Sequence, residues 1–562
     1  MQLRKETKAK ELHILFCVAP FMAGLYYELT CAAFSLALIA WLWKYAKGAA
    51  ITLRWNTAAA SVLLFFAAYL ITPFWAVDRG MAVWGIAKAL PLPLFSLCIM
   101  QISKEERDAM LHSLPMIGCI MTVVSCVLCI VPSLETFFII NGRLGGFFQY
   151  PNTFACFLLL GIENLIFDEQ IVKWKRYVQM IVLVTGLLQA GSRAVFLLAL
   201  VSVLLAVLYR KNGEVLLSAL MGSVGGLIAS VLFSILKEQA PMEHMLDISA
   251  DASTFLGRLL YWKDALPVIA KKPFGLGYLG YYFLQGTFQT GVYSVRWIHN
   301  DLLQFLLDVG WIPVILCLIA LWKALRSGTI LIWQKIILLT LLLHAACDFD
   351  LEYTAMFFIL LLNLDWDNGK QYQIKYIRIS GIAAIIATAL SLWIGLSSTL
   401  TVLGKDLAAV RIYPGNTFSQ LHLLTEDTDM VTFAERSTHI IRQNSYSAVA
   451  WNARAIVAQQ QGDYSAVVYA KRKAISCNKY DLTEYTDYID KLLAGAAQYN
   501  RSGQPENARL CIEEAKRVPL YLTDVQANTS TLAWRIADKP QLELPQEYLD
   551  RLAALTNEGS ML

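Results

Sequence analysis

A stretch of the chain between two apolar segments carries an arginine, a tryptophan and a histidine. Arg258 precedes Trp262 by four residues, and His299 precedes Asn300 at the start of the next apolar run. Arginine holds phosphate oxygens through two parallel hydrogen bonds and keeps its charge. Histidine takes a proton near neutral pH, as a general base toward a hydroxyl must. These residue types suit a reaction on an anionic, lipid-linked substrate at a membrane surface.

Further polar groups stand beside apolar segments and are candidates for the same site. Arg143 and Asn152 flank a glycine- and phenylalanine-rich turn, Arg193 follows a glycine-serine pair, and His344 precedes Asp348 by four residues. Arg193 begins a predicted helix, whose exposed N–H groups favour anions. The alternative for each arginine is snorkelling to lipid headgroups, and the alternative for His344 is burial as a packing or hydrogen-bonding residue.

Three features also have a structural interpretation. The run His299-Asn300-Asp301 caps the following helix if Asn300 or Asp301 accepts its first N–H groups, and such a cap would also fix the histidine. The acidic run 348–352 could hold a divalent cation. A solvated helix end, or counter-ions for the arginines, is the favoured interpretation, so we predict no metal and no cofactor. Tyr278 and its aromatic neighbours suit either stacking on sugar rings or an interfacial aromatic belt.

Composition identifies a membrane protein. Of 562 residues, 57% are hydrophobic and only 16% are charged, against about 25% charged in soluble domains. Apolar runs of about 18 or more residues recur, and backbone groups in lipid must pair within their own segment. We therefore predict an all-α, polytopic transmembrane bundle. About thirteen spans are expected, near residues 12–28, 30–45, 56–74, 80–100, 109–131, 152–167, 177–190, 194–209, 214–236, 300–323, 329–347, 353–366 and 377–400.

The basic residues predict the orientation of these spans. Lysines such as Lys8, Lys44, Lys104 and Lys323 lie in every second loop, which predicts a cytoplasmic N-terminus. The expected location is the plasma or inner membrane. The candidate polar groups then all fall on the outer side, where they could converge on one cavity. The net charge of +4 reflects the cytoplasmic loops and predicts no nucleic-acid partner.

Two domains are expected. Residues 1–403 form the transmembrane domain, with a long outer loop at about 237–298, and residues 404–562 form a helical domain outside the membrane. Within the latter, residues 450–475 and 488–515 each read as two helices joined at a glycine turn. Such units resemble tetratricopeptide-type repeats, which bury their apolar faces by stacking. The alternative is an all-helical cap without repeats.

Cysteine usage predicts neither a metal site nor a redox site. Nine of the 11 cysteines lie in or beside apolar spans, where a thiol behaves as a small hydrophobe. The one C-x-x-C pair, Cys126 and Cys129, lies inside a span and has no second pair to complete a zinc site. Cys477 and Cys511 lie in the outer domain and could pair.

The ordered set of motifs resembles the O-antigen ligase/polymerase family over roughly residues 56–366. The resemblance implies a membrane glycosyltransferase of the GT-C type that inverts configuration and works outside the cytoplasm without nucleotide sugar or metal. It would move a glycan from a polyprenyl diphosphate carrier to an acceptor hydroxyl. The motifs that carry the resemblance are Arg143 with Pro151-Asn152, Gly191-Ser192-Arg193, Gly257-Arg258 with Trp262, Pro273 with Gly275 and Gly277, and His299-Asn300 with Gly310.

Carried onto this chain, the resemblance implies that Arg193 and Arg258 hold the leaving diphosphate and that His299 activates the acceptor. The implied partners are the lipid-linked glycan, an acceptor glycan, lipid or protein, membrane lipids, and a protein bound by the outer helices. Because the outer domain departs from the ligase pattern, the acceptor stays open. The residues expected to bind substrate are Arg143, Asn152, Trp262, Tyr278, Asn300, His344 and Asp348.

Two non-enzymatic functions compete with this one. A transporter or flippase of lipid-linked glycans would also need arginines for diphosphate. It would be expected to place ionisable groups along a path through the bilayer, and the predicted spans carry few charges at mid-depth. A membrane-anchored scaffold for polysaccharide assembly would instead depend on the outer helices.

Overall fold

The chain forms two compact units, which are described separately. The computed structural model describes residues 2–46, 50–167, 173–210, 213–237, 248–374 and 377–558. Its 76% helix content confirms the predicted all-α class. The first unit comprises Met1–Ile71, Trp84–Ile248 and Ile298–Thr399, and the second comprises Thr72–Val83, Ser249–Trp297 and Leu400–Leu562.

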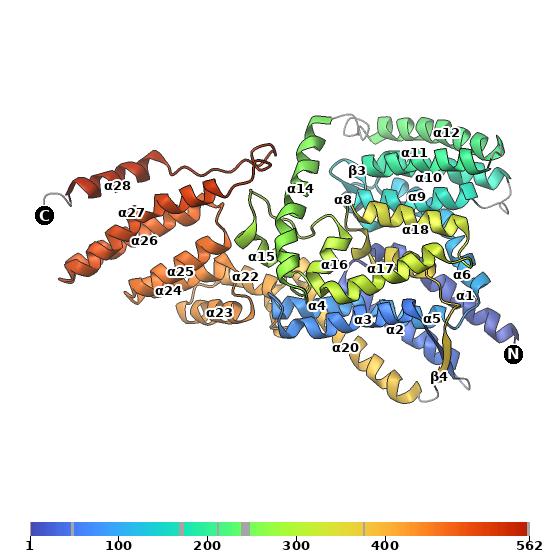
Figure 1. Ribbon diagram of the computed structural model, residues 1–562, viewed down its shortest axis with the longest axis horizontal. Coiled ribbons are helices and arrows are strands. Elements are labelled where there is room, and N and C mark those ends of the chain that lie inside the picture. Colours follow the sequence, from blue (N-terminus) through green and yellow to red (C-terminus); the bar gives the residue numbers. More distant parts are fainter. Residues whose placement is uncertain are drawn as a thin grey trace. The chain divides into compact units, whose positions relative to one another are not determined.

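The first unit is a bundle of apolar helices (Figure 1). Each of the thirteen segments expected to span the membrane contains a helix. The helices are α1 (Gln2–Val18), α2 (Glu28–Ala46), α3 (Thr57–Ile71), α4 (Arg79–Ala89), α5 (Pro91–Ile99), α6 (Lys104–Leu111), α7 (Leu114–Leu128), α8 (Pro132–Phe138), α9 (Pro151–Phe167), α10 (Lys173–Ala190), α11 (Arg193–Arg210), α12 (Gly213–Lys237), α16 (Asp301–Val309), α17 (Trp311–Arg326), α18 (Ile332–Ala345), α19 (Thr354–Leu362) and α20 (Ile377–Val402). The first five residues of α4 and the last three of α20 belong to the second unit.

Helix α9 is the centre of this bundle. Most of its residues are apolar, and all of its side chains are buried, including those of Glu163 and Asn164, except that of Asn152, which is half-buried. A largely apolar helix that is buried on every side must be covered on every side. Four helices, α7, α10, α11 and α18, pack against it, and Figure 1 shows α9 between α10 and α18.

Several of these helices suit a bilayer. Among the described residues, six helical segments reach 18 residues and are apolar enough to cross a membrane, and three shorter helices are also apolar. They indicate a membrane-embedded protein, while the number of spans and the orientation stay predictions. The six are Glu28–Ala46, Thr57–Phe74, Arg79–Ile99, Lys104–Leu128, Leu217–Leu236 and Gly381–Val402, and the shorter ones are Pro151–Phe167, Arg193–Leu205 and Ile332–Ala345.

Several of the expected spans are divided into shorter elements in the structure, and two of them show the cause most clearly. Over residues 12–28 the α-helix ends at Val18, and short 3₁₀ turns follow at Ala19–Phe21 and Ala23–Leu25. Position 20 is a proline. Proline has no backbone N–H, so the hydrogen-bond pattern of the helix cannot continue there. Over residues 300–323 the helix breaks between α16 and α17 at Gly310, whose φ is +82°. Both breaks therefore occur at residues that favour non-helical backbone.

Four short strands connect parts of the first unit. Strand β1 (Ile51–Trp55) pairs antiparallel with β4 (Lys370–Ile374), joining the loop after α2 to the segment before α20. Strand β2 (Ile139–Ile140) pairs with β3 (Arg143–Leu144) across the two-residue turn at positions 141 and 142, which have φ of +51° and +72°. Asparagine followed by glycine is the preferred sequence for such a turn.

The second unit is built from helical pairs. Helix α24 packs on α25 after a turn at Gly462, and α26 packs on α27 after a turn at Gly503. Both glycine turns were expected, while the resemblance to tetratricopeptide repeats stays a prediction. Cys477 and Cys511 are both free thiols. The helices are α14 (Ile248–Lys271), α15 (Gly280–Phe288), α21 (Asp406–Ile412), α22 (Thr417–Glu426), α23 (Met430–Gln443), α24 (Ala448–Gln460), α25 (Tyr464–Cys477), α26 (Leu482–Arg501), α27 (Pro505–Ala527) and α28 (Gln546–Glu558).

A buried lysine joins three helices of this unit. Lys471 of α25 is 1% exposed, and its Nζ lies 2.7 Å from Oδ1 of Asn452, 2.7 Å from Oε2 of Glu484 and 2.9 Å from Oδ2 of Asp487. Replacing Lys471 with methionine should destabilise this unit by about 3–5 kcal/mol, because the buried Glu484 carboxylate would lose its cation. The loss of stability can be measured by unfolding the full-length protein in detergent and monitoring the cleavage of residues 404–562 by limited proteolysis.

The control for Lys471→Met is Arg509→Met on α27. Arg509 forms an exposed ion pair with Glu513 one turn away, with 3.1 Å between Nε and Oε1. Exposed pairs of this kind contribute about 0.3–0.5 kcal/mol. Equal destabilisation by both substitutions would contradict a structural role for the buried lysine.

Candidate active site

The β2–β3 hairpin positions the first of the predicted polar groups. The turn at 141–142 directs the chain back so that Arg143 follows at once on β3. Its Nη2 donates to Oδ1 of Asn152, 2.7 Å away, and its Nε donates to the carbonyl oxygen of Ala190, 2.8 Å away. Arg143 therefore ties the first turn of α9 to the last residue of α10.

Asp348, just after α18, is the hub of a hydrogen-bond network. Its Oδ1 accepts from the Tyr150 hydroxyl at 2.9 Å and from its neighbour's backbone N–H at 3.0 Å. Its Oδ2 accepts from Nδ2 of Asn152 at 2.8 Å. Because the carboxylate is 1% exposed, these donors replace the water that would otherwise stabilise its charge. The network links Asp348 through Asn152 to Arg143.

The same carboxylate holds the predicted histidine. Nδ1 of His299 lies 3.2 Å from Oδ1 of Asp348, and the imidazole edge packs against the Phe349 ring with centroids 5.1 Å apart. A proton on Nδ1, donated to the carboxylate, leaves Nε2 as the basic nitrogen. The His299 side chain is 23% exposed. The contact with Asp348 therefore holds the imidazole in position, while its exposed part stays accessible to a substrate.

Asn300, and not His299, caps the helix that follows. Its Oδ1 accepts from the backbone N–H of Leu303 at 3.0 Å, and its Nδ2 donates to the carbonyl oxygen of Ala346 at 2.8 Å. The predicted cap of α16 is thus confirmed at Asn300. His299 itself has φ of +53°, so it is held in the left-handed region between the cap and the Asp348 contact.

His344 lies deeper, in a buried polar cluster. Its Nδ1 is 2.5 Å from Oδ2 of Asp350, whose Oδ1 accepts from the Thr153 hydroxyl at 2.7 Å. The ligand atoms of Cys156, His344 and Asp350 lie within 4.8 Å of one another, so they could surround a metal ion. Both Asp350 oxygens, however, are already engaged by protein donors. This arrangement is that of a satisfied polar core, and we assign no metal to it.

Arg193 is the first residue of α11. The preceding Gly191 has φ of +58°, which makes the tight turn from α10 into α11 possible. Ser192 is buried and the arginine is half-buried. The carbonyl that accepts from Arg143 belongs to Ala190, three residues before Arg193. One corner of the bundle thus carries two predicted arginines at the positive end of an 18-residue helix.

The remaining predicted residues lie in the second unit. Arg258 and Trp262 are half-buried on α14 and are one turn apart, so they share a face of that helix. Tyr278 is 2% exposed and packs against Trp297 with ring centroids 5.6 Å apart. The segment expected as a long outer loop is mainly the helices α14 and α15, and its residues 238–247 lie outside the described part of the chain.

Residues 178–319 match a family model described as O-antigen ligase. Over this range the chain is similar to the O-antigen ligase family. No curated protein matches the chain.

The matched range contains Arg193, Arg258 and His299, the three residues expected to be catalytic. Arg143, Asn152, His344 and Asp348 lie outside the matched range. Within the first unit the structure brings His299 together with Asp348, Asn152 and Arg143, which join it from outside the match. The polar network thus connects the matched range, through His299, to α9 and to the end of α18.

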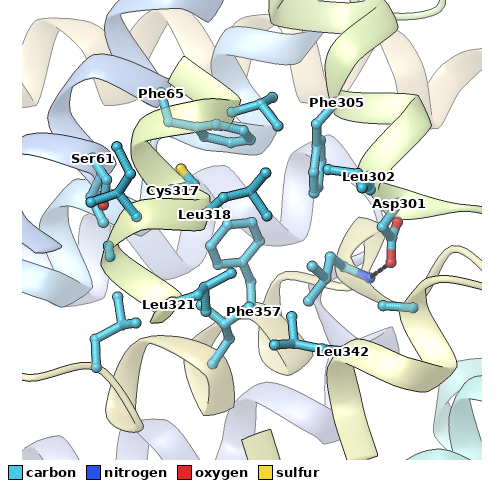
Figure 2. A pocket seen from close by; sticks show the side chains of 18 of the residues that line it. Ser61, Phe65, Asp301, Leu302, Phe305, Cys317, Leu318, Leu321, Leu342 and Phe357 are labelled. Carbon is cyan, nitrogen blue, oxygen red and sulfur yellow. Dashed lines mark hydrogen bonds between the residues drawn. The ribbon is translucent and has the colours of Figure 1, made fainter. Parts of the chain in front are cut away.

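An apolar pocket of about 610 Å³ lies beside this network in the first unit. Helices α3, α5, α16, α17, α18 and α19 contribute to its lining, which includes Phe65, Leu318 and Phe357 (Figure 2). Asp301, the second residue after His299, lies at its edge. Figure 2 shows its Oδ2 accepting from the backbone N–H of Leu351, at 2.8 Å. The pocket therefore adjoins the segment that carries the histidine.

Two polar side chains with contacts inside the first unit were not predicted from the sequence. Tyr150 donates to Asp348, but it stands beside proline in an aromatic run and gave no distinct signal. Lys88 is buried on α4, and its Nζ donates to the backbone carbonyls of Tyr26 and Glu352, both at 2.6 Å. A lysine inside the apolar run 80–100 was a usable signal, because charges there are costly and are paired.

Proposed function

We propose that the protein transfers a glycan from a polyprenyl diphosphate carrier to an acceptor hydroxyl at the outer face of the membrane. Membrane glycan transfer is indicated by the ligase domain. The observation that carries the finer proposal is the contact of His299 with Asp348, because it orients an imidazole as a base. The enzyme is proposed to be an inverting glycosyltransferase of the GT-C type.

In the proposed reaction the acceptor oxygen attacks the anomeric carbon as the bond from that carbon to the phosphate oxygen breaks. The acceptor proton passes to Nε2 of His299, and polyprenyl diphosphate leaves. Attack from the face opposite the leaving group inverts the anomeric configuration. Asp348 stabilises the imidazolium that forms and holds its orientation, in the way that a buried carboxylate serves a catalytic histidine in hydrolases. The imidazolium then returns its proton to water.

Arginines are proposed to hold the leaving diphosphate. Departure of this group concentrates negative charge on its oxygens, and fixed donors in a site away from bulk water lower the barrier by several kcal/mol. Arg193, at the start of α11, combines its own charge with that of the helix end. Arg258, on α14, is proposed as the second arginine that binds the diphosphate. With two guanidinium groups on the diphosphate, the reaction as proposed uses no metal ion.

The apolar pocket supports a lipid-linked donor. Its lining of leucine, phenylalanine and other apolar side chains suits a hydrocarbon chain and not a sugar. A chain placed there would end beside Asp301, two residues from the proposed base. We propose that it takes the first isoprene units of the carrier, while Asn152, Trp262, Tyr278 and Asn300 contact the glycan or the acceptor.

The proposed setting is the plasma or inner membrane, with a cytoplasmic N-terminus and an outer C-terminal helical domain. That domain is proposed to bind the acceptor or a protein partner. The acceptor is a glycan, a lipid or a protein.

The test is incubation of purified protein with a defined lipid-linked oligosaccharide and candidate acceptors, followed by mass spectrometry. We expect free polyprenyl diphosphate and a glycosylated acceptor in equal amounts. Movement of the lipid across liposome bilayers without release of polyprenyl diphosphate would overturn transfer and favour the transporter. Unchanged glycan assembly in cells that carry the His299→Asn variant would favour the scaffold.

A further inference from the structure

A buried carboxyl group in the middle of α9 connects three helices of the first unit. Glu163 is fully buried, and its Oε1 accepts from the hydroxyl of Ser202 on α11. The same oxygen accepts from the hydroxyl of Thr340 on α18, with 2.6 Å between the two oxygens. Helices α9, α11 and α18 also pack directly on one another. One side chain therefore fixes a three-helix contact.

Stability alone does not account for an acidic residue at this position. The neighbours of Glu163 in α9 include Leu159, Leu160, Ile162 and Ile166, so a leucine would pack there without burying a polar group. Among the described residues, Oε2 of Glu163 has no hydrogen-bond partner. A buried, incompletely paired carboxyl lowers stability relative to a well-packed apolar side chain. Ionisable residues within apolar helices are for this reason treated first as functional.

The three helices that Glu163 joins are those that carry the site. Helix α9 begins with the turn that holds Asn152, α11 begins with Arg193, and α18 leads into Asp348. We propose that Glu163 is a positioning residue that fixes these three helices relative to one another and thereby the distance from the arginine to the histidine–aspartate pair. This inference depends on the proposed function. Displacements of about 1 Å at a reacting centre can reduce rates about 10²-fold.

The test compares Glu163→Leu with Glu163→Gln. Glutamine keeps an Oε1 that accepts both hydroxyls, so its kcat for glycan transfer should stay within about twofold of the wild type. Leucine removes the acceptor, and kcat should fall by about 10- to 100-fold while KM for the lipid-linked glycan changes little. Hydrogen exchange of the full-length protein should become faster at residues 191–196 in Glu163→Leu alone. A large loss with glutamine, or wild-type kcat with leucine, would overturn the inference.

Glu28 provides a matched control within the same bundle. It is a buried carboxyl on α2, and its Oε2 accepts from the hydroxyl of Ser398 on α20 at 2.7 Å. Neither helix carries a residue of the proposed site. Glu28→Leu should therefore keep wild-type kcat even if it changes the melting temperature as much as Glu163→Leu does. If kcat falls in both variants, and in proportion to the fall in melting temperature, Glu163 has only a structural role.

The two proposals can fail separately. If the wild type releases no polyprenyl diphosphate, the proposed function fails before any variant is compared. Faster exchange at residues 191–196 in Glu163→Leu, with normal exchange in Glu163→Gln, would still show that the contact positions Arg193. Unchanged exchange in both, together with active wild-type enzyme and unaffected kcat, would remove the positioning role alone.

Discussion

Glycan transfer should fall by about 10²- to 10⁴-fold when His299 is replaced by asparagine, the range expected for loss of a general base. Asparagine is the appropriate replacement because His299 has φ of +53°, which asparagine tolerates better than alanine does. The backbone and the cap at Asn300 should then persist. Turnover of a lipid-linked glycan by purified variant protein measures the effect, with kcat and KM determined separately.

His422→Asn is the control for this substitution. His422 is exposed on α22 and lies 3.3 Å from a carboxylate oxygen of Asp406, so it shares the residue type and the partner type of His299. The control should retain wild-type turnover. A His299→Asn variant with normal turnover would end the assignment of a base. A variant that loses only thermal stability would show that this segment serves as a helix cap and nothing more.

The helices could be predicted from the sequence because their apolar runs are long. Even the segment at 152–167, short for a bilayer, is the central helix α9, because most of its residues are apolar. The breaks at Val18 and Gly310 were not predicted. A window of hydrophobicity averages over single residues, whereas one proline or one glycine with positive φ is enough to end a helix.

The members of the site were easier to predict than their contacts. Asn152 and Asp348 are 196 residues apart in the sequence. The predicted topology puts both on the same side of the membrane, but it does not indicate that Nδ2 of Asn152 lies 2.8 Å from Oδ2 of Asp348. Asp348 was expected to bind substrate, but its oxygens are occupied by Tyr150, Asn152 and His299. Composition reports which groups are polar near an apolar segment. Which of them satisfy one another depends on packing between distant helices.

The family resemblance implies a role in binding the diphosphate for two arginines, Arg193 and Arg258. The two residues lie in different parts of the structure. Arg193 begins α11 in the first unit, while Arg258 lies on α14 in the second, four residues before Trp262. For Arg193 the helix end provides an independent reason to favour an anion. For Arg258 the reason is chemical: a planar fork with five donors matches the oxygens of a diphosphate, and lysine offers only a point charge. The second arginine is therefore the sharper test of the leaving-group assignment.

Replacing Arg258 with alanine should lower kcat by about 10²- to 10³-fold, the usual effect of removing one donor to a developing oxyanion. Arg258→Lys should recover little of this loss, because a bidentate contact cannot be made by an ammonium group. Lys263→Ala on the same helix, where the lysine donates to the Ser530 hydroxyl at 3.0 Å, should keep wild-type kcat. Full recovery by lysine would mean that only charge is needed at this position. Wild-type turnover by Arg258→Ala would remove this arginine from the reaction and leave Arg193 to hold the diphosphate.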